Sequence, residues 1–195
     1  YRPSDPKILR LALELGLITL FIPEFKKIRN LAQFTYYHSE TVDLHSLKTL
    51  ETLHHIARGM YGDRWPMFKQ IYDELKNPER LFLVGLLHDI GKGYRGEHSA
   101  RGAEIVPRIW KRLGADEKAV QGIAFLIQHH LLLANVSQRR DLNDEKTAVQ
   151  VAQVVGDLET LRRRFLLTVA DSLATGPIAS SDWKIMLVIE LFFKV

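Results

Sequence analysis

Apolar side chains recur along most of this chain at the three- and four-residue spacing of an α-helix. The alternation of apolar and polar residues that is typical of half-buried β-strands is absent, and short glycine-, proline- or polar-rich stretches separate the helical patterns. The pattern predicts helices over residues 6–23, 43–60, 66–75, 78–89, 99–114, 116–131, 144–155, 158–174 and 182–194. The expected fold is therefore all-α, a compact helical bundle with an N-terminal helical extension.

Several expected helix ends carry capping signals. Asn77 precedes Pro78, which is the order of an N-cap residue followed by proline at the first helical position. Ser99 is expected to cap the next helix, and Gly114 is expected to end it. The polar stretch 131–144 is expected to connect two helices rather than to form one.

Composition places the chain among globular proteins. Of its 195 residues, 46% are hydrophobic and 26% are charged, so it can bury a core. The formal net charge of +4 favours anionic ligands weakly and does not by itself indicate a nucleic-acid partner, which we do not expect. The short basic runs, Arg139-Arg140 and Arg162-Arg163-Arg164, are expected to be solvated helix faces.

The chain contains no cysteine, which excludes disulfides and thiolate metal ligands and fits a reducing, cytoplasmic location. No stretch reaches the roughly 18 apolar residues that span a bilayer, so we expect no membrane partner. Because the chain begins at Tyr1 and stops within an apolar helical pattern, we expect it to be a piece of a longer protein with flanking domains.

The pair His88-Asp89 stands at the end of an apolar helical run, "LFLVGLL", in which Gly85 would let another helix approach closely. An ionised carboxylate in apolar surroundings needs a partner, because desolvation costs several kcal/mol. That partner is a metal ion, another ionic group or water. The dipeptide alone leaves a metal site and a solvent-exposed helix end equally open.

Four further places in the chain add nitrogen and oxygen ligands near the ends of expected helices. They are His45 in "TVDLHSL", His98 after the glycine-rich loop, His129-His130 after "IAFLIQ", and Asp171 in "FLLTVADSLA". Each is ordinary singly, but together they form a ligand set without sulfur. Such a set suits Mn, Fe, Co, Ni, Mg or a catalytic Zn.

Three other histidines are left out of this set. His54 follows His45 by nine residues, so it lies on the opposite face of the same helix, and His55 is its neighbour. Both are expected to be packed or solvent-facing. His38 would share a face with His45 only if the helix extended that far toward the N-terminus.

The order of His45, then His88-Asp89, then Asp171, all on expected helices, resembles the H…HD…D pattern of the HD-domain superfamily of metal-dependent phosphohydrolases. The resemblance is closer to one family. The segments "TVDLHSLKTL", "LFLVGLLHDIGKGYRGEHSARGAE", "FLIQHHLLLANVSQRRDLND" and "LTVADSLATGPIASSDWK" are similar, in order and spacing, to the HD domain of bifunctional uridylyltransferase/uridylyl-removing enzymes. The similarity covers about residues 25–190. It implies a helical linker over 1–24 and an HD-type phosphohydrolase domain over 25–195.

The resemblance also implies roles for individual residues. His45, His88, Asp89 and Asp171 match the metal ligands of the superfamily. His98 and His130 match histidines that bind a second metal or contact the phosphate, and we expect them to be catalytic; His129 ranks below His130. Lys92, in the loop after Asp89, is a candidate catalytic point charge for the phosphate. Arg139 and Arg140 are candidate substrate-binding residues.

The implied cofactor is a divalent metal ion such as Mn, Mg or Fe, either one ion or two. The implied activity is metal-dependent hydrolysis of the phosphodiester between UMP and a tyrosine of a uridylylated PII-like signal protein, which would be the partner. Two alternatives stay open at this point. One is an HD hydrolase of a free nucleotide, such as a dNTP, a cyclic nucleotide or a guanosine alarmone, and the other is a non-catalytic nucleotide-binding regulatory module.

Overall fold

The computed structural model describes residues 6–32, 40–114, 117–176 and 180–195. Within these ranges every regular element is a helix, and an isolated bridge between Ala32 and Thr41 is the one β-type pairing. The all-α prediction is therefore confirmed. The elements in chain order are α1 (Pro6–Glu14), α2 (Leu17–Phe21), the 3-10 helix η1 (Pro23–Lys27), α3 (Val42–Ala57), α4 (Met67–Asp73), α5 (Glu79–Leu87), the 3-10 helix η2 (Ile90–Gly93), α6 (His98–Arg112), α7 (Glu117–Gln128), α8 (Leu132–Arg139), α9 (Glu145–Val155), α10 (Leu158–Thr175) and α11 (Asp182–Lys194).

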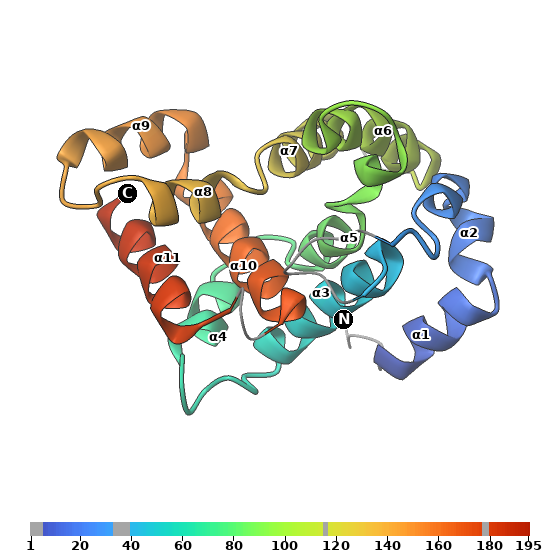
Figure 1. Cartoon of the computed structure of the whole chain (residues 1–195), viewed down its shortest axis with the longest axis horizontal. Helices are drawn as coiled ribbons and strands as arrows, with labels where there is room; N and C mark the ends of the chain where they lie inside the picture. The colour runs from blue at the N-terminus through green and yellow to red at the C-terminus, as the bar shows by residue number, and fades with distance from the viewer. Residues whose placement is uncertain (1–5, 33–39, 115–116, 177–179) are drawn as a thin grey trace.

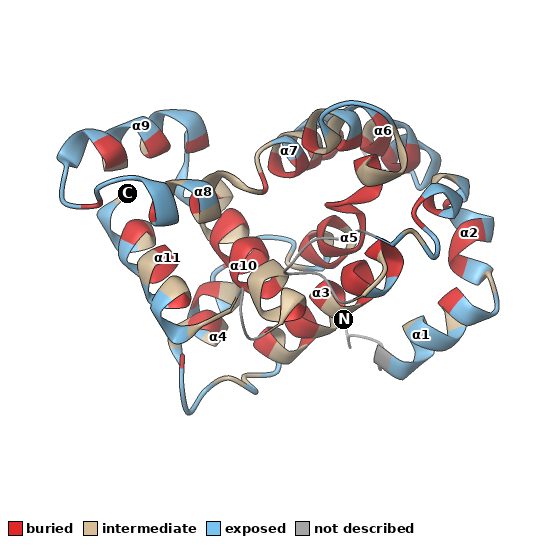
Figure 2. Cartoon of the chain, in the orientation of Figure 1, coloured by how far each residue is buried: buried red, intermediate tan, exposed pale blue. Residues whose placement is uncertain are grey.

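Helices α3, α5 and α10 form the centre of the molecule (Figure 1). Helix α3 packs against both α5 and α10, while α6 and α7 form a pair that η2 joins to the end of α5. The inner faces of the three central helices are buried, and α9 exposes most of its surface (Figure 2). Gly85 brings α5 close to α3, since a Cβ at this position would lie 2.6 Å from the Cδ1 atom of Leu53.

Two predicted segments differ from the structure. The expected helix 6–23 is broken into α1 and α2, because Gly16 has a φ of 76° and its amide donates to the carbonyl oxygen of Leu13. The stretch 131–144, expected to be a connection, contains helix α8. Leu133 is fully buried there, so tertiary packing stabilises this helix. The polar residues of the stretch had led to the prediction of a connection.

Two predicted caps are also wrong. Asn77 has a φ of 51° and is not the N-cap residue of α5, because Pro78 takes that position in a helical conformation. Helix α6 begins one residue before Ser99, and the cap is Glu97, whose carboxylate accepts hydrogen bonds from the amides of Ser99 and Ala100. A carboxylate at this position also complements the positive end of the helix dipole.

The basic run on α10 is solvated only in part. Arg162 pairs with Glu74 and Arg163 pairs with Glu159, both near the surface. Arg164 is 1% exposed, so the expectation of a solvated face is wrong for this residue. Successive helical residues point about 100° apart, so three in a row cannot all face the solvent on a helix packed on several sides.

By length and mean hydropathy alone, Ala119–Arg139 qualifies as a candidate membrane span among the described residues, contrary to the expectation that no segment is long enough. This is weak evidence for a membrane segment, because core helices of soluble proteins meet the same test. In this fold the stretch consists of α7 and α8 with a break at 129–131, and Ile127 and Leu133 lie in the core.

Candidate metal centre

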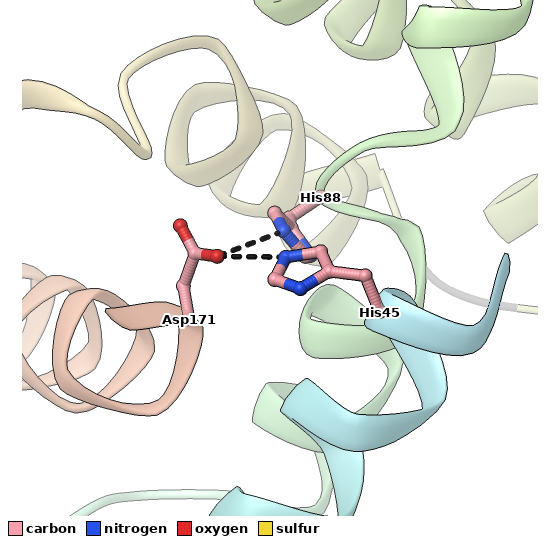
Figure 3. A group of neighbouring side chains, drawn as sticks. All are labelled: His45, His88 and Asp171. Carbon is pink, nitrogen blue, oxygen red and sulfur yellow. Dashed lines mark hydrogen bonds and ion pairs between the residues drawn. The ribbon is translucent and has the colours of Figure 1, made fainter. Parts of the chain in front are cut away.

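Three side chains from three central helices converge on one point (Figure 3). Asp171 of α10 places its Oδ1 atom 2.8 Å from Nε2 of His45, in the first turns of α3, and 3.5 Å from Nε2 of His88. All three ligand atoms lie within 4.8 Å of one another, so a single ion can contact them together. We call this set the first ligand group.

The end of α5 fixes the orientation of His88. Its ring is fully buried, and its Nδ1–H donates to the carbonyl oxygen of Gly85 at 2.8 Å. This bond directs Nε2 toward Asp171 and Asp89. The Nε2 atom is buried and makes no hydrogen bond among the described residues, although carboxylate oxygens of Asp89 and Asp171 lie 3.4 and 3.5 Å away. A buried nitrogen without a hydrogen bond, next to two carboxylates, suits a metal ligand.

A second ligand group lies beside the first and consists of Asp89, His98 and His130. The Oδ1 atom of Asp89 is 3.7 Å from Nε2 of His98 and 3.8 Å from Nε2 of His130. His130 repeats the arrangement of His88, because its Nδ1–H donates to the carbonyl oxygen of Ile127 at 2.7 Å. In both residues a backbone carbonyl therefore fixes the ring and leaves Nε2 available.

The carboxylate of Asp89 lies between the two groups. Its Oδ1 atom faces His98 and His130, and its Oδ2 atom lies 3.4 Å from Nε2 of His88 and 3.8 Å from Nε2 of His45. The Oδ2 atom also accepts from the ammonium group of Lys92 at 2.7 Å. Asp89 can thus serve both groups at once.

The four imidazole rings form a row from α3 to α6. Ring centroids are 5.3 Å apart between His45 and His88, 5.3 Å between His88 and His130, and 5.4 Å between His130 and His98. Among the candidate ligands, the side chains of His98 and Asp171 are the most exposed, at 27% and 21%. These two side chains are therefore the parts of the cluster most accessible to solvent.

Burial and mutual charge set the protonation of these groups. Burial acts to lower the pKa of His88, but the carboxylates of Asp89 and Asp171 outweigh it and raise the pKa to about 10. Burial, together with the charge on His88, lowers the pKa of His130 to about 4. Burial acts to raise the pKa of both carboxyl groups, but the positive charge on His88 holds each below its usual range. His130 is therefore neutral and ready to coordinate at neutral pH.

These shifts predict how the stability of the metal-free protein depends on pH. His88 keeps its proton in the folded state up to about pH 10 but loses it near 6.5 when unfolded, so stability falls as pH rises through this window. Folded His130 stays neutral down to about pH 4, whereas the unfolded residue takes up a proton near 6.5, so stability falls as pH drops through that window.

Thermal unfolding measured in a chelator between pH 4 and pH 10 is therefore expected to show a maximum near pH 6.5. An excess of divalent cation should remove the alkaline decline, because the cation replaces the proton on His88. A midpoint that keeps rising from pH 7 to pH 9 in chelator would contradict this assignment.

The structure brings together six of the predicted residues, which are His45, His88, Asp89, His98, His130 and Asp171. Lys92 joins them through its ion pair with Asp89. The resemblance to HD domains led us to expect that these side chains lie together. The role of each residue as a ligand or a catalyst stays a prediction.

Other candidates lie outside the cluster. Arg139 and Arg140 are exposed at the far end of α8, so their substrate-binding role stays a prediction. His54 is buried with its ring centroid 6.1 Å from that of Phe82, and His55 lies 6.5 Å from Tyr61. His38 falls outside the described residues.

The sequence pattern did not identify Gly91 as a residue that positions the site. Gly91 is buried in η2, where a Cβ would fall on the carbonyl oxygen of His98 and lie 2.7 Å from the amide nitrogen of Gly102. The missing side chain therefore lets η2, which follows Asp89, pack directly against the first turns of α6. The only sequence signal was a glycine within a stretch interpreted as a loop.

Replacing Gly91 by alanine is expected to push α6 away from η2 and to move His98 out of reach of Asp89. We expect cation affinity of the second ligand group to fall by about tenfold or more, while the first group is spared. Calorimetric titration with Mn²⁺ measures this effect. Gly122→Ala is the control, because among the described residues no atom outside its own stretch of α7 lies within 4 Å of a Cβ at that position. Equal Mn²⁺ binding by Gly91→Ala and wild type would contradict the packing argument.

Comparison with known proteins agrees with this geometry. Residues 42–176 match the profile of the HD-domain family. The chain is 36% identical over 190 residues to the bifunctional uridylyltransferase/uridylyl-removing enzyme of Rhodospirillum rubrum, and 38% identical over 192 residues to that of Phenylobacterium zucineum. The alignments cover 97% and 98% of this chain but 20% of each relative, so the chain spans about a fifth of their length. Because the HD-domain profile matches more than half of the chain, including all six clustered residues, the chain belongs to the HD-domain family of metal-dependent phosphohydrolases.

Proposed function

We propose that this chain removes uridylyl groups from a PII-like signal protein by hydrolysing the phosphodiester between UMP and a tyrosine. The names of the relatives support a uridylyl-removing activity. The observation that carries the proposal is the pair of ligand groups that share Asp89. Two adjacent divalent cations suit a reaction in which one oxygen attacks phosphorus and another leaves.

The residues of the chain would hold two cations in a fixed relation. His45, His88 and Asp171 would hold one, His98 and His130 the other, and Asp89 would contact both. Bound cations lower the pKa of water and neutralise charge on the phosphoryl oxygens. The buried helix ends behind His88 and His130 would keep these ligands from moving during the reaction.

The hydrolysis itself needs a water molecule and a proton donor. The oxygen of water bonds to phosphorus, the bond from phosphorus to the tyrosine oxygen breaks, and a proton passes to the leaving tyrosinate. UMP and the free tyrosine are the products. His98 is the most exposed imidazole of the cluster, so it is the group best placed to deliver that proton if it is not held by a cation.

Lys92 would have two partners in turn. Its ammonium group lies 2.7 Å from the Oδ2 atom of Asp89. A bound metal cation would be attracted to the same carboxylate. We propose that a bound cation releases this side chain to contact the substrate phosphate. Arg139 and Arg140 would meet an acidic surface of the protein partner, since both are exposed.

The remaining parts of the proposal concern the chain around the site. Residues 1–24 would form a linker from a preceding domain, and residues 25–195 would form the hydrolase domain. Flanking domains of a longer protein are expected because the relatives are about five times as long as the chain. A cytoplasmic location fits a signal protein as partner.

The proposal is tested by a substrate panel with the purified chain and Mn²⁺. A uridylylated PII protein is expected to release UMP, and a chelator is expected to stop the release until Mn²⁺ is restored. A dNTP, a cyclic nucleotide and a guanosine alarmone are expected to react far more slowly. Rapid hydrolysis of one of these nucleotides without UMP release would assign the site to a nucleotide hydrolase. Cation binding without hydrolysis of any substrate would indicate a regulatory module.

A further inference from the structure

A buried arginine lies next to the turn that carries His130. Arg164 is 1% exposed on α10, and the centre of its guanidinium lies 4.6 Å from the ring centroid of Phe125. Its Nη1 atom donates to the carbonyl oxygen of His129 at 2.9 Å. Within the part of the chain that the structure describes, no carboxylate lies within 4 Å of this guanidinium.

The environment of Arg164 is unfavourable for a cation. Burial alone lowers its pKa to about 10, so the side chain is still charged at neutral pH. Its Nε and Nη2 atoms are buried and have no acceptor among the described residues. A buried charge without a counter-ion, with two unused donors, is often replaced by an apolar side chain without loss of stability. Apart from the contact with Phe125 and the bond to His129, folding stability therefore gives no reason for an arginine at this position.

The one strong bond of Arg164 reaches the backbone next to a candidate ligand. The carbonyl oxygen of His129 belongs to the turn between α7 and α8, and it also accepts from the amide of Leu132 at 3.0 Å. His130 is the next residue, and its Nε2 atom lies 3.8 Å from Oδ1 of Asp89. A shift of this turn would therefore move His130 relative to Asp89.

The same helix also carries a ligand of the first group. Asp171 follows Arg164 by seven residues, which is close to two helical turns, so both side chains lie on one face of α10. Helix α10 packs against both α7 and α8. Arg164 thus ties the turn that carries His130 to the helix that carries Asp171.

We propose that Arg164 is a positioning residue for the second ligand group, and that its bond to the carbonyl of His129 sets the distance between His130 and Asp89. The inference rests on the proposed pair of cations and not on the identity of the substrate. Removal of a residue that orients a metal ligand lowers metal affinity by about 10- to 100-fold. The loss of metal affinity is expected at the second ligand group. The contacts of Arg164 with His129 and Phe125 lie beside His130 and not beside a residue of the first ligand group.

The test is calorimetric titration of the chain with Mn²⁺. Wild type is expected to take up two ions. Arg164→Leu is expected to bind the first ion as wild type does and the second ion at least about tenfold more weakly. Arg164→Lys keeps the charge and one donor, so its affinity for the second ion should lie between the two. Arg162→Leu is the matched control, because Arg162 lies two residues before Arg164 on α10 and pairs with Glu74, away from both ligand groups. This variant should bind both ions normally.

A purely structural role is separated by thermal unfolding in a chelator. Arg164→Leu is expected to unfold at no lower temperature than wild type. The inference would be overturned if Arg164→Leu bound both ions with the affinities of wild type. It would also be overturned if the affinities for both ions fell equally and the unfolding temperature fell as well. Uptake of a single ion by wild type would also overturn it. If Arg164→Leu does not fold, the test rests on Arg164→Lys. The inference is then overturned if Arg164→Lys binds both ions as tightly as wild type does. Failure to release UMP from a uridylylated protein would leave these binding results unaffected.

Discussion

Replacing Asp89 by asparagine is expected to weaken the binding of both cations and to slow hydrolysis by roughly a thousandfold. Among the described residues, Asp89 is the carboxylate that faces both groups, with Oδ1 toward His98 and His130 and Oδ2 toward His88. An amide keeps the shape of the side chain but removes its charge. If the cations supply about 4 kcal/mol of transition-state stabilisation, the loss in rate is roughly a thousandfold.

The measurement combines phosphodiester hydrolysis with calorimetric titration by Mn²⁺. Asp73→Asn is the control, because Asp73 is a surface carboxylate that pairs with Lys69 by one helical turn. Asp89→Asn should still fold, since the amide fits the same buried space. Full activity in Asp89→Asn, or uptake of even one ion with wild-type affinity, would contradict the role of a shared ligand.

The positions of the ligand residues could be predicted from sequence because each stands at a helix end beside a strong apolar pattern. His88-Asp89 follows a run with buried Leu81, Val84 and Leu87, and such a run fixes the end of the helix in the core. The order along the chain then matched that of a known family. The pattern therefore identified which residues converge, but it gave no distances and did not show that Asp89 lies between two groups.

What the sequence did not predict depends on packing between distant segments. Gly91 and Arg164 have no local signal, because their roles come from α6 and from the turn at His129. Helix α8 was missed for a related reason, since the burial of Leu133 rather than periodicity stabilises it. The break at Gly16 could have been predicted, because glycine commonly ends a helix in the left-handed conformation.

Replacing Asp171 by alanine is expected to remove one cation and to spare the other. Its Oδ1 atom lies near His45 and His88, which complete the first ligand group. The second ligand group does not include Asp171. The remaining ligands, Asp89, His98 and His130, should still bind one ion. Losing one of two cations is expected to cost about 3 kcal/mol in the barrier, or roughly a hundredfold in rate.

The matched control for Asp171→Ala is Thr175→Ala, one turn further along α10. The Thr175 hydroxyl donates only to the backbone carbonyl of Asp171, so its loss should leave both ions in place. Because the Asp171 side chain is 21% exposed, its truncation opens to solvent and should not unfold the chain. One ion of unchanged affinity in Asp171→Ala, with weaker binding of both ions in Asp89→Asn, is the pattern expected of a shared carboxylate. Two ions in Asp171→Ala would mean that His45 and His88 hold a cation without this carboxylate, and loss of both would mean that the two groups do not bind independently.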